Sequence, residues 1–163
     1  MSNDTPQKKI RLIKYKCRIG RGLRQYKKRK IDKLKRVIVA IQNTLVSEAI
    51  LIALKKRGMF AEKSLSGEPQ KVADLCGTLF ADTLVMDVTR FGDGTFNNRA
   101  ATINAVKKIS PKIKICLVFD NVSDGELSVK VANAKETGTI DAFFYQSVPS
   151  DYIADVILSL IHI

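Results

Sequence analysis

Few side chains in this 163-residue chain have the type and spacing of a catalytic or metal site. The single histidine, His162, stands one residue from the C-terminus, so we expect neither His-based nucleophilic catalysis nor a His-rich metal site. Cys17, Cys76 and Cys116 are scattered without a CxxC spacing, which predicts reduced thiols and no disulfide framework. Asp87 remains, at the end of the apolar segment TLVMDV. A lone Asp at such a position commonly caps a loop by accepting backbone N–H groups.

The elements that must position Asp87 follow from alternating hydrophobic patterns. Short apolar runs rich in β-branched residues predict strands buried on both faces, and apolar residues at helical spacing predict helices between them. The predicted strands are Val37–Ile41, Phe60–Leu65, Thr83–Val88, Ile113–Phe119 and Ile140–Tyr145. The predicted helices are Leu45–Arg57, Pro69–Thr78, Phe96–Ile109, residues 123–138 and Ser150–Leu160. Five βα units favour an α/β fold, a doubly wound five-stranded parallel sheet in the order 2-1-3-4-5.

Three local expectations follow from these elements. The apolar spacing of the first helix predicts that Leu45, Ala49, Ile52 and Ala53 form its buried stripe. Cys76 and Cys116 are expected to be small core residues. Gly92 and Gly94, in the loop after Asp87, predict a turn that needs positive φ.

Ligands of a doubly wound sheet bind at the carboxyl ends of its strands. Those ends are predicted to carry Ile41 and Gln42, Asp87, Phe119 and Asp120, and Tyr145 and Gln146. The segment Gln42–Leu45 after the first strand contains no glycine. Dinucleotide-binding and Walker-type phosphate loops are therefore disfavoured.

The segment Ala81–Gly94, with the aspartate that ends its strand and its glycine loop, resembles the third strand and following loop of response-regulator receiver domains. Strand spacing extends this resemblance over about residues 35–161. The resemblance implies a flavodoxin/CheY-like (βα)5 fold in which Asp87 matches the aspartate that accepts a phosphoryl group.

Other positions of the receiver site differ from the family pattern. Receivers end strand one with two acids that hold Mg²⁺, where this chain has Ile41 and Gln42. Receivers end strand four with Ser or Thr and strand five with Lys, where this chain has Phe119, followed by Asp120, and Gln146. Phosphoryl transfer depends on positioning and charge neutralisation, which these replacements remove.

The resemblance therefore implies a degenerate, non-enzymatic receiver that acts as a protein-interaction module and needs no cofactor. The alternative is a phosphorylatable receiver of a two-component phosphorelay, with Asp87 as phosphoacceptor and Mg²⁺ as cofactor. A third possibility is the leading domain of a larger architecture, since degenerate receivers also head some pilus-assembly ATPases.

The last predicted helix carries more apolar surface than packing on one sheet face requires. Asp151, Asp155 and Ser159 form a narrow polar stripe, and apolar residues cover most of the remaining circumference. This pattern favours a protein interface that includes Tyr152, Val156 and Leu158. In receivers, the usual docking surface is the face of helix four, strand five and helix five, which suggests a partner there, such as a second copy. The alternative is that the leading arm or the C-terminus covers the surface.

Charge divides the chain near residue 36. Residues 1–36 contain fifteen Lys and Arg against two acids, whereas residues 37–163 contain thirteen against fourteen. The arm therefore carries a charge of +13 and the remainder −1, which together give the net charge of +12. We therefore expect a basic N-terminal arm, 1–36, and a receiver-like domain, 37–163. Ile13–Ile19 has the period-2 pattern of a strand with one charged face, and Leu23–Arg36 has the spacing of a basic amphipathic helix.

The clustered positive charge of the arm predicts that it binds a polyanion. Its candidate contacts are Lys27, Lys28, Arg29, Lys30, Lys33, Lys35 and Arg36. Nucleic acid bound through residues 8–36, an acidic protein, an anionic membrane surface and a merely solvated arm all remain open. No apolar run is long enough for a transmembrane segment and no secretory signal is present, so we expect a cytoplasmic protein.

Overall fold

In the computed structural model, residues 34–120 and 125–162 are described. The strands are β1 (Arg36–Ala40), β2 (Phe60–Lys63), β3 (Thr83–Val88), β4 (Lys114–Phe119) and β5 (Ala142–Tyr145). The helices are α2 (Thr44–Lys56), α3 (Pro69–Thr78), α4 (Phe96–Ile109), α5 (Gly125–Glu136) and α6 (Ser150–His162), with the 3-10 turn η1 (Gly92–Gly94) before α4.

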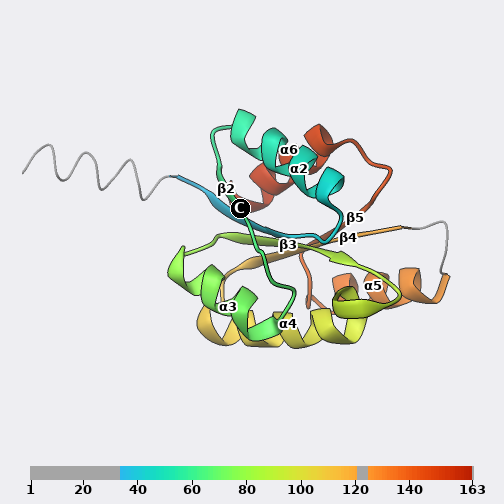
Figure 1. Cartoon of the computed structure of the whole chain (residues 1–163). Coiled ribbons are helices and arrows are strands. Elements are labelled where there is room, and N and C mark those ends of the chain that lie inside the picture. Colours follow the sequence, from blue (N-terminus) through green and yellow to red (C-terminus); the bar gives the residue numbers. More distant parts are fainter. Residues whose placement is uncertain (1–33, 121–124, 163) are drawn as a thin grey trace, which may run out of the picture. The chain divides into compact units, whose positions relative to one another are not determined.

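The five strands form one parallel sheet in the order β2-β1-β3-β4-β5, as the sequence predicted. Helices α2 and α6 cover one face, and α3, α4 and α5 cover the other (Figure 1). Alternate strand residues enter the two cores: Val37, Val39 and Val85 lie under α2 and α6, whereas Ile38, Leu84 and Met86 face the opposite layer. Burial on both faces explains why the central strands β1, β3 and β4 are almost continuously apolar.

Helix α2 presents a different face to the core from the predicted one. Its buried side is Ser47, Ile50, Leu51, Ala53 and Leu54. Leu45 and Ile52 are 83% and 53% exposed, and Ala49 is exposed as well. The predicted stripe was therefore wrong at all residues but Ala53, because this helix carries apolar residues on two faces and spacing alone does not say which face meets the sheet.

Element ends differ from the predicted ones by a few residues. β2 ends at Lys63, and Leu65 lies in the following loop, 97% exposed. Ile140 is buried but precedes the ladder of β5, which begins at Ala142. The first two residues of the helix predicted at 123–138 lie outside the described residues.

The sheet-bearing unit begins at Lys35, so two residues assigned to the arm by charge belong to it. The carbonyl of Lys35 accepts the N–H of Phe60, and Arg36 opens β1. The Arg36 backbone N–H donates to Asp82, and its guanidinium donates to the carbonyl of Leu79. The amphipathic helix predicted to reach Arg36 was therefore wrong at its end. The rest of that helix, and the strand predicted at residues 13–19, lie outside the described residues.

Candidate functional site

A pocket of about 560 Å³ opens at the carboxyl ends of β1, β3 and β4. The sequence-predicted positions meet there, as its lining includes Ile41, Gln42, Asp87, Phe119, Asp120 and Gln146. The parallel register brings them together, because the carboxyl ends of parallel strands lie at one edge of the sheet.

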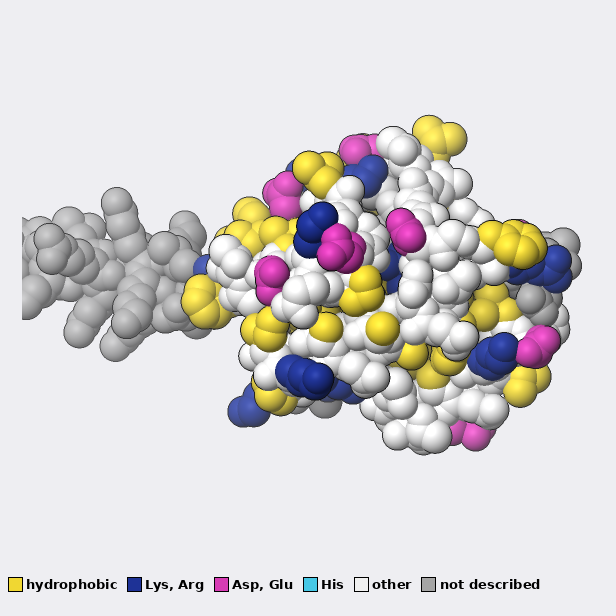
Figure 2. Space-filling view, turned by 60° about the horizontal axis from the view of Figure 1, so that its bottom comes forward, with side chains coloured by type: hydrophobic (Ala, Val, Ile, Leu, Met, Phe, Trp, Pro, Cys, Tyr) yellow, Lys and Arg dark blue, Asp and Glu magenta, His cyan; other side chains and the backbone are white. Residues whose placement is uncertain are grey.

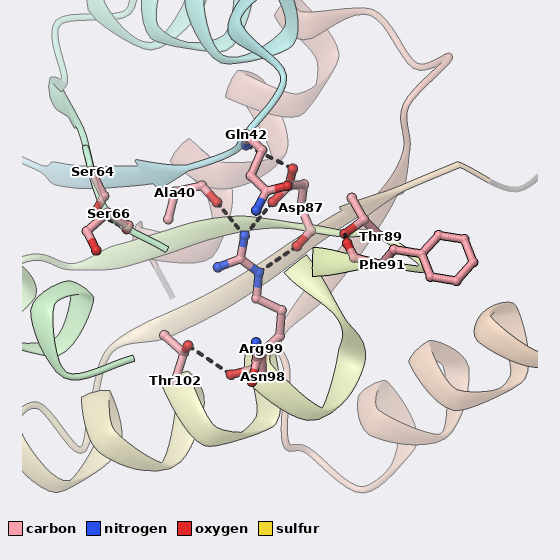
Figure 3. Close-up of polar contacts among 10 residues, drawn as sticks. All are labelled: Ala40, Gln42, Ser64, Ser66, Asp87, Thr89, Phe91, Asn98, Arg99 and Thr102. Atoms are coloured by element: carbon pink, nitrogen blue, oxygen red, sulfur yellow. Dashed lines mark hydrogen bonds and ion pairs between the residues drawn. The ribbon is translucent and has the colours of Figure 1, made fainter. Parts of the chain in front are cut away.

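Asp87 is 7% exposed, and both of its carboxylate oxygens have partners within the fold. Oδ1 accepts a hydrogen bond from Nη2 of Arg99 at 2.5 Å, an ion pair between two buried side chains. Oδ2 accepts the backbone N–H of Gln42 at 2.9 Å, which ties β3 to the end of β1 (Figure 3). Asp87 thus accepts a backbone N–H, as expected of a capping aspartate, and also balances a buried cation.

Arg99 reaches this carboxylate from the first turn of α4 and is 1% exposed. Its Nε donates to the backbone carbonyl of Asp87 at 2.8 Å, and Nη2 also donates to the carbonyl of Ala40 at 3.1 Å. The guanidinium therefore bridges the ends of β1 and β3, the two strands between which the chain order of this sheet reverses. This is the switch point where doubly wound folds commonly bind ligands.

Sequence reasoning missed Arg99, which places a cation beside Asp87. A signal was present in the spacing of the helix. Arg99, Thr102, Ile103 and Val106 form the buried side of α4, so a basic residue occupies the core-facing stripe. A buried guanidinium requires a nearby carboxylate, and Asp87 ends the strand that precedes this helix.

The remaining positions predicted from the receiver pattern differ in burial. Ile41 and Phe119 are buried, whereas Gln42, Asp120 and Gln146 are exposed. The ring of Phe119 packs against Tyr145 and Phe143, with centroids 5.2 and 5.9 Å away. Arg90, in the loop after β3, also lines the pocket.

The loop after Asp87 uses its two glycines for different reasons. Gly92 has φ of +77°, as the sequence predicted. Gly94 has no such φ, but a Cβ there would lie 2.4 Å from the hydroxyl oxygen of Thr89. The Thr89 N–H donates to the Gly94 carbonyl at 2.8 Å, so the glycine permits a close approach that closes the loop.

These residues do not fit a receiver-type magnesium site. Mg²⁺ prefers near-octahedral oxygen ligands, with one or two carboxylates. Ile41 has no side-chain oxygen, and the oxygens of Asp87 are engaged by Arg99 and the Gln42 N–H. Within residues 34–120 and 125–162, no group of three or more His, Cys, Asp or Glu residues could hold a metal ion.

The predicted core cysteines and the predicted interface residues do not line the pocket that contains Asp87. Cys76 and Cys116 are buried free thiols, and burial raises the pKa of each to about 12. Tyr152 is 58% exposed, but Val156 and Leu158 are half-buried and pack against the core under α2 and α6. Part of the apolar surplus of α6 is thus covered by the domain itself.

The polar stripe of α6 is also used internally. Arg57, at the end of α2, donates to Asp151 at 3.0 Å and to Asp155 at 2.5 Å. These bonds raise the pKa of Arg57 and lower that of Asp155.

Of the predicted polyanion contacts, Lys27, Lys28, Arg29, Lys30 and Lys33 lie outside the described residues. No helix in the described part of the chain has the length and apolarity of a membrane span.

Comparisons with known proteins identify the fold. No family model matches the sequence, and no curated protein matches it. Solved structures do: a response regulator from Thermotoga maritima has a TM-score of 0.63 at 16% identity, covering 80% of this chain and 99% of that one. A CheY-like receiver domain protein from Methanospirillum hungatei JF-1 has 0.62 at 18% identity, covering 80% and 95%. A CheY-like protein (tadZ) from Pseudomonas aeruginosa PAO1 has 0.60 at 13% identity, covering 77% and 98%. The chain therefore has the fold of response-regulator receiver domains.

Proposed function

We propose that this chain is a degenerate receiver that acts as a non-enzymatic interaction module and does not use Asp87 as a phosphoacceptor. The observation that carries the proposal is the pairing of Asp87 Oδ1 with the buried guanidinium of Arg99. In this arrangement the carboxylate at the acceptor position belongs to the structural framework, because it balances a cation inside the fold.

Phosphorylation would disturb this framework. An acyl phosphate formed on Oδ1 would replace the bond to Arg99, and one formed on Oδ2 would replace the bond to the Gln42 N–H. Separation of a buried ion pair costs about 3–5 kcal/mol because the remaining charge is left uncompensated. Phe119 provides no hydroxyl to the transferring group, and the charge of Asp120 opposes further negative charge.

Intact-mass measurement after incubation with acetyl phosphate and Mg²⁺ tests the proposal. We expect no gain of a phosphoryl group on the wild-type chain, and none on Asp87→Asn, which controls for modification elsewhere. A Mg²⁺-dependent gain of one phosphoryl group that Asp87→Asn abolishes would overturn the proposal.

The second candidate function is a phosphorylatable receiver of a phosphorelay with Asp87 as acceptor. Arg90 favours it, because a guanidinium that lines the same pocket could neutralise charge on a phosphoryl group. The same mass measurement decides between the two functions, and Arg90→Gln would reduce the rate of any modification that is found.

The interaction surface that we propose is the face of α5, β5 and α6. Val129, Tyr145 and Tyr152 keep it partly apolar, with 58%, 37% and 58% of each residue exposed. A second copy of the chain is the simplest partner. Sedimentation velocity should show that Tyr152→Glu weakens self-association, whereas Phe91→Glu, in the loop after β3, leaves it unchanged. A wild type that stays monomeric at high concentration would contradict self-association.

The basic arm, residues 8–36, is proposed to bind a polyanion, with nucleic acid as the first candidate. The charge balance of the chain supports it, because the arm carries the excess positive charge and the remainder is nearly neutral. On the face seen in Figure 2, acidic and basic side chains of the described residues are interspersed and do not form one large acidic surface.

A further inference from the structure

A second pocket, of about 250 Å³, lies on the side of Gln42 that faces β2. The end of β1, the end of β2 and the loop that leads into α3 form it together with Arg99. Gln42 lines both this pocket and the one that contains Asp87, so the Asp87–Arg99 ion pair stands between two cavities. Nothing in the receiver-like site described above uses the second pocket.

One nitrogen of the Arg99 guanidinium takes no part in the ion pair with Asp87. Nε and Nη2 donate to carbonyl and carboxylate oxygens, but Nη1 is buried and has no hydrogen-bond partner within the fold. Figure 3 shows it pointing away from Asp87, toward the side on which Ser64 and Ser66 lie. A buried guanidinium nitrogen without an acceptor is costly, and an acceptor in this pocket would remove the cost.

Among the described residues, no carboxylate lines this pocket as a charged acceptor for Nη1. Its lining contains the basic side chains of Arg99 and Lys63 and no acidic side chain. Ser66 Oγ accepts the N–H of Glu68 at 3.1 Å, which leaves its own proton to be donated. Arg99 is already balanced by Asp87, so Lys63 leaves the pocket with a net positive charge.

We infer that this pocket binds a small oxyanion, a phosphate or a carboxylate group, through Nη1 of Arg99, with Ser66 and Lys63 completing the shell. Guanidinium nitrogens bind such oxygens with short, charge-assisted hydrogen bonds. The inference does not depend on whether Asp87 is phosphorylated, because the free nitrogen lies on the opposite side of the ion pair.

Titration of the ¹⁵N-labelled full chain, followed by amide spectra, tests it. Inorganic phosphate, acetate and chloride are added separately at equal ionic strength. We expect saturable shifts of the backbone amides of Gln42, Ser64, Ser66 and Gly67 with phosphate or acetate and none with chloride. The anion whose titration saturates, phosphate or acetate, distinguishes a phosphate ligand from a carboxylate ligand. Shifts confined to lysine-rich segments, or absent from these four amides, would overturn the inference.

Variants separate this site from general attraction of anions. Lys63→Met should weaken binding about fivefold, whereas Lys56→Met, an equal loss of charge at the exposed end of α2, should not change it. Arg99→Lys keeps a cation beside Asp87 but lacks Nη1, and should abolish the shifts. Ser66→Ala, which leaves the ion pair intact, gives the same test if Arg99→Lys fails to fold. Equal affinity of Lys63→Met, Ser66→Ala and the wild type would overturn the inference.

Discussion

At the residue scale, the position of Arg99 requires a guanidinium. Its planar fork reaches three acceptors on two strands at once: the carbonyls of Ala40 and Asp87 and the carboxylate of Asp87. A lysine ammonium could not present donors to both strand ends in this flat arrangement. The same fork explains why one nitrogen remains directed at the neighbouring pocket.

The two described cysteines should be protected from alkylation in the folded chain. Thiolate is the reactive form, and burial raises the pKa of Cys76 and Cys116 from 9.0 to about 12. At pH 8 the thiolate fraction, and with it the rate of iodoacetamide labelling, should fall on the order of a thousandfold relative to the chain in urea. Peptide-resolved mass spectrometry after timed labelling measures this. Equal rates in native buffer and urea would contradict the buried positions.

The thiols also affect stability at high pH. Because each pKa is raised in the folded state, the neutral thiols stabilise the fold below pH 9, and this contribution is lost as the pH rises from 9 toward 12.

The acceptor-position aspartate could be found from the sequence, but its partner could not be assigned. Asp87 follows a continuous apolar run, so its place at a strand end was determined by local pattern. Arg99 lies twelve residues later on the buried side of α4, but apolar spacing alone does not show which carboxylate that side of the helix will meet. The ion pair is a tertiary feature, which is why the sequence prediction did not include the Arg99 cation.

At the element scale, α2 offers a direct check of helix orientation. Ile50 is buried and Ile52 is half exposed on the same helix. Ile50→Ala should cost about 2–5 kcal/mol in the free energy of unfolding, whereas Ile52→Ala should change it by about 0.5 kcal/mol or less. Urea denaturation of both variants gives the comparison. A larger cost at Ile52 would restore the face that apolar spacing alone favours.

The contact between α2 and α6 predicts a pH dependence. Arg57 lowers the pKa of Asp155, so the ionised carboxylate stabilises the fold above its usual pKa, and this contribution is lost as the pH falls. The stability difference between the wild type and Asp155→Asn should therefore shrink between pH 7 and pH 3. Asp74→Asn, at an exposed position on α3, is the matched control. A difference that grows toward low pH would contradict the contact.

Patterns predicted the elements better than their edges. The three central strands, β1, β3 and β4, were recognisable because both of their faces are buried, which makes each a nearly continuous apolar run. The edges depend on where the ladder stops: Leu65 is apolar yet lies beyond β2, and Arg36 is basic yet opens β1. Charge therefore placed the start of the folded unit slightly too late.

At the scale of the whole molecule, the arm should bind polyanions through charge. Replacement of Lys27, Lys28, Arg29 and Lys30 by Ala should weaken binding about equally for unrelated nucleic acid sequences. The log–log salt slope on duplex DNA should be about −0.9 for each phosphate neutralised. Fluorescence anisotropy with duplex DNA, single-stranded RNA and anionic vesicles measures both. No binding to any of them at low salt would contradict the polyanion role.

The most direct test of a structural role for Asp87 is the free energy of unfolding of wild type, Asp87→Asn, Arg99→Met and the double variant, measured in urea. Because each single change leaves one buried group of the pair unpaired, each should lower stability by about 3–5 kcal/mol. The double variant should be destabilised by clearly less than the sum of the two, since the charges are removed together. If Asp87→Asn is as stable as the wild type, or more stable, Asp87 is a free acidic group available for phosphorylation, and the account is contradicted.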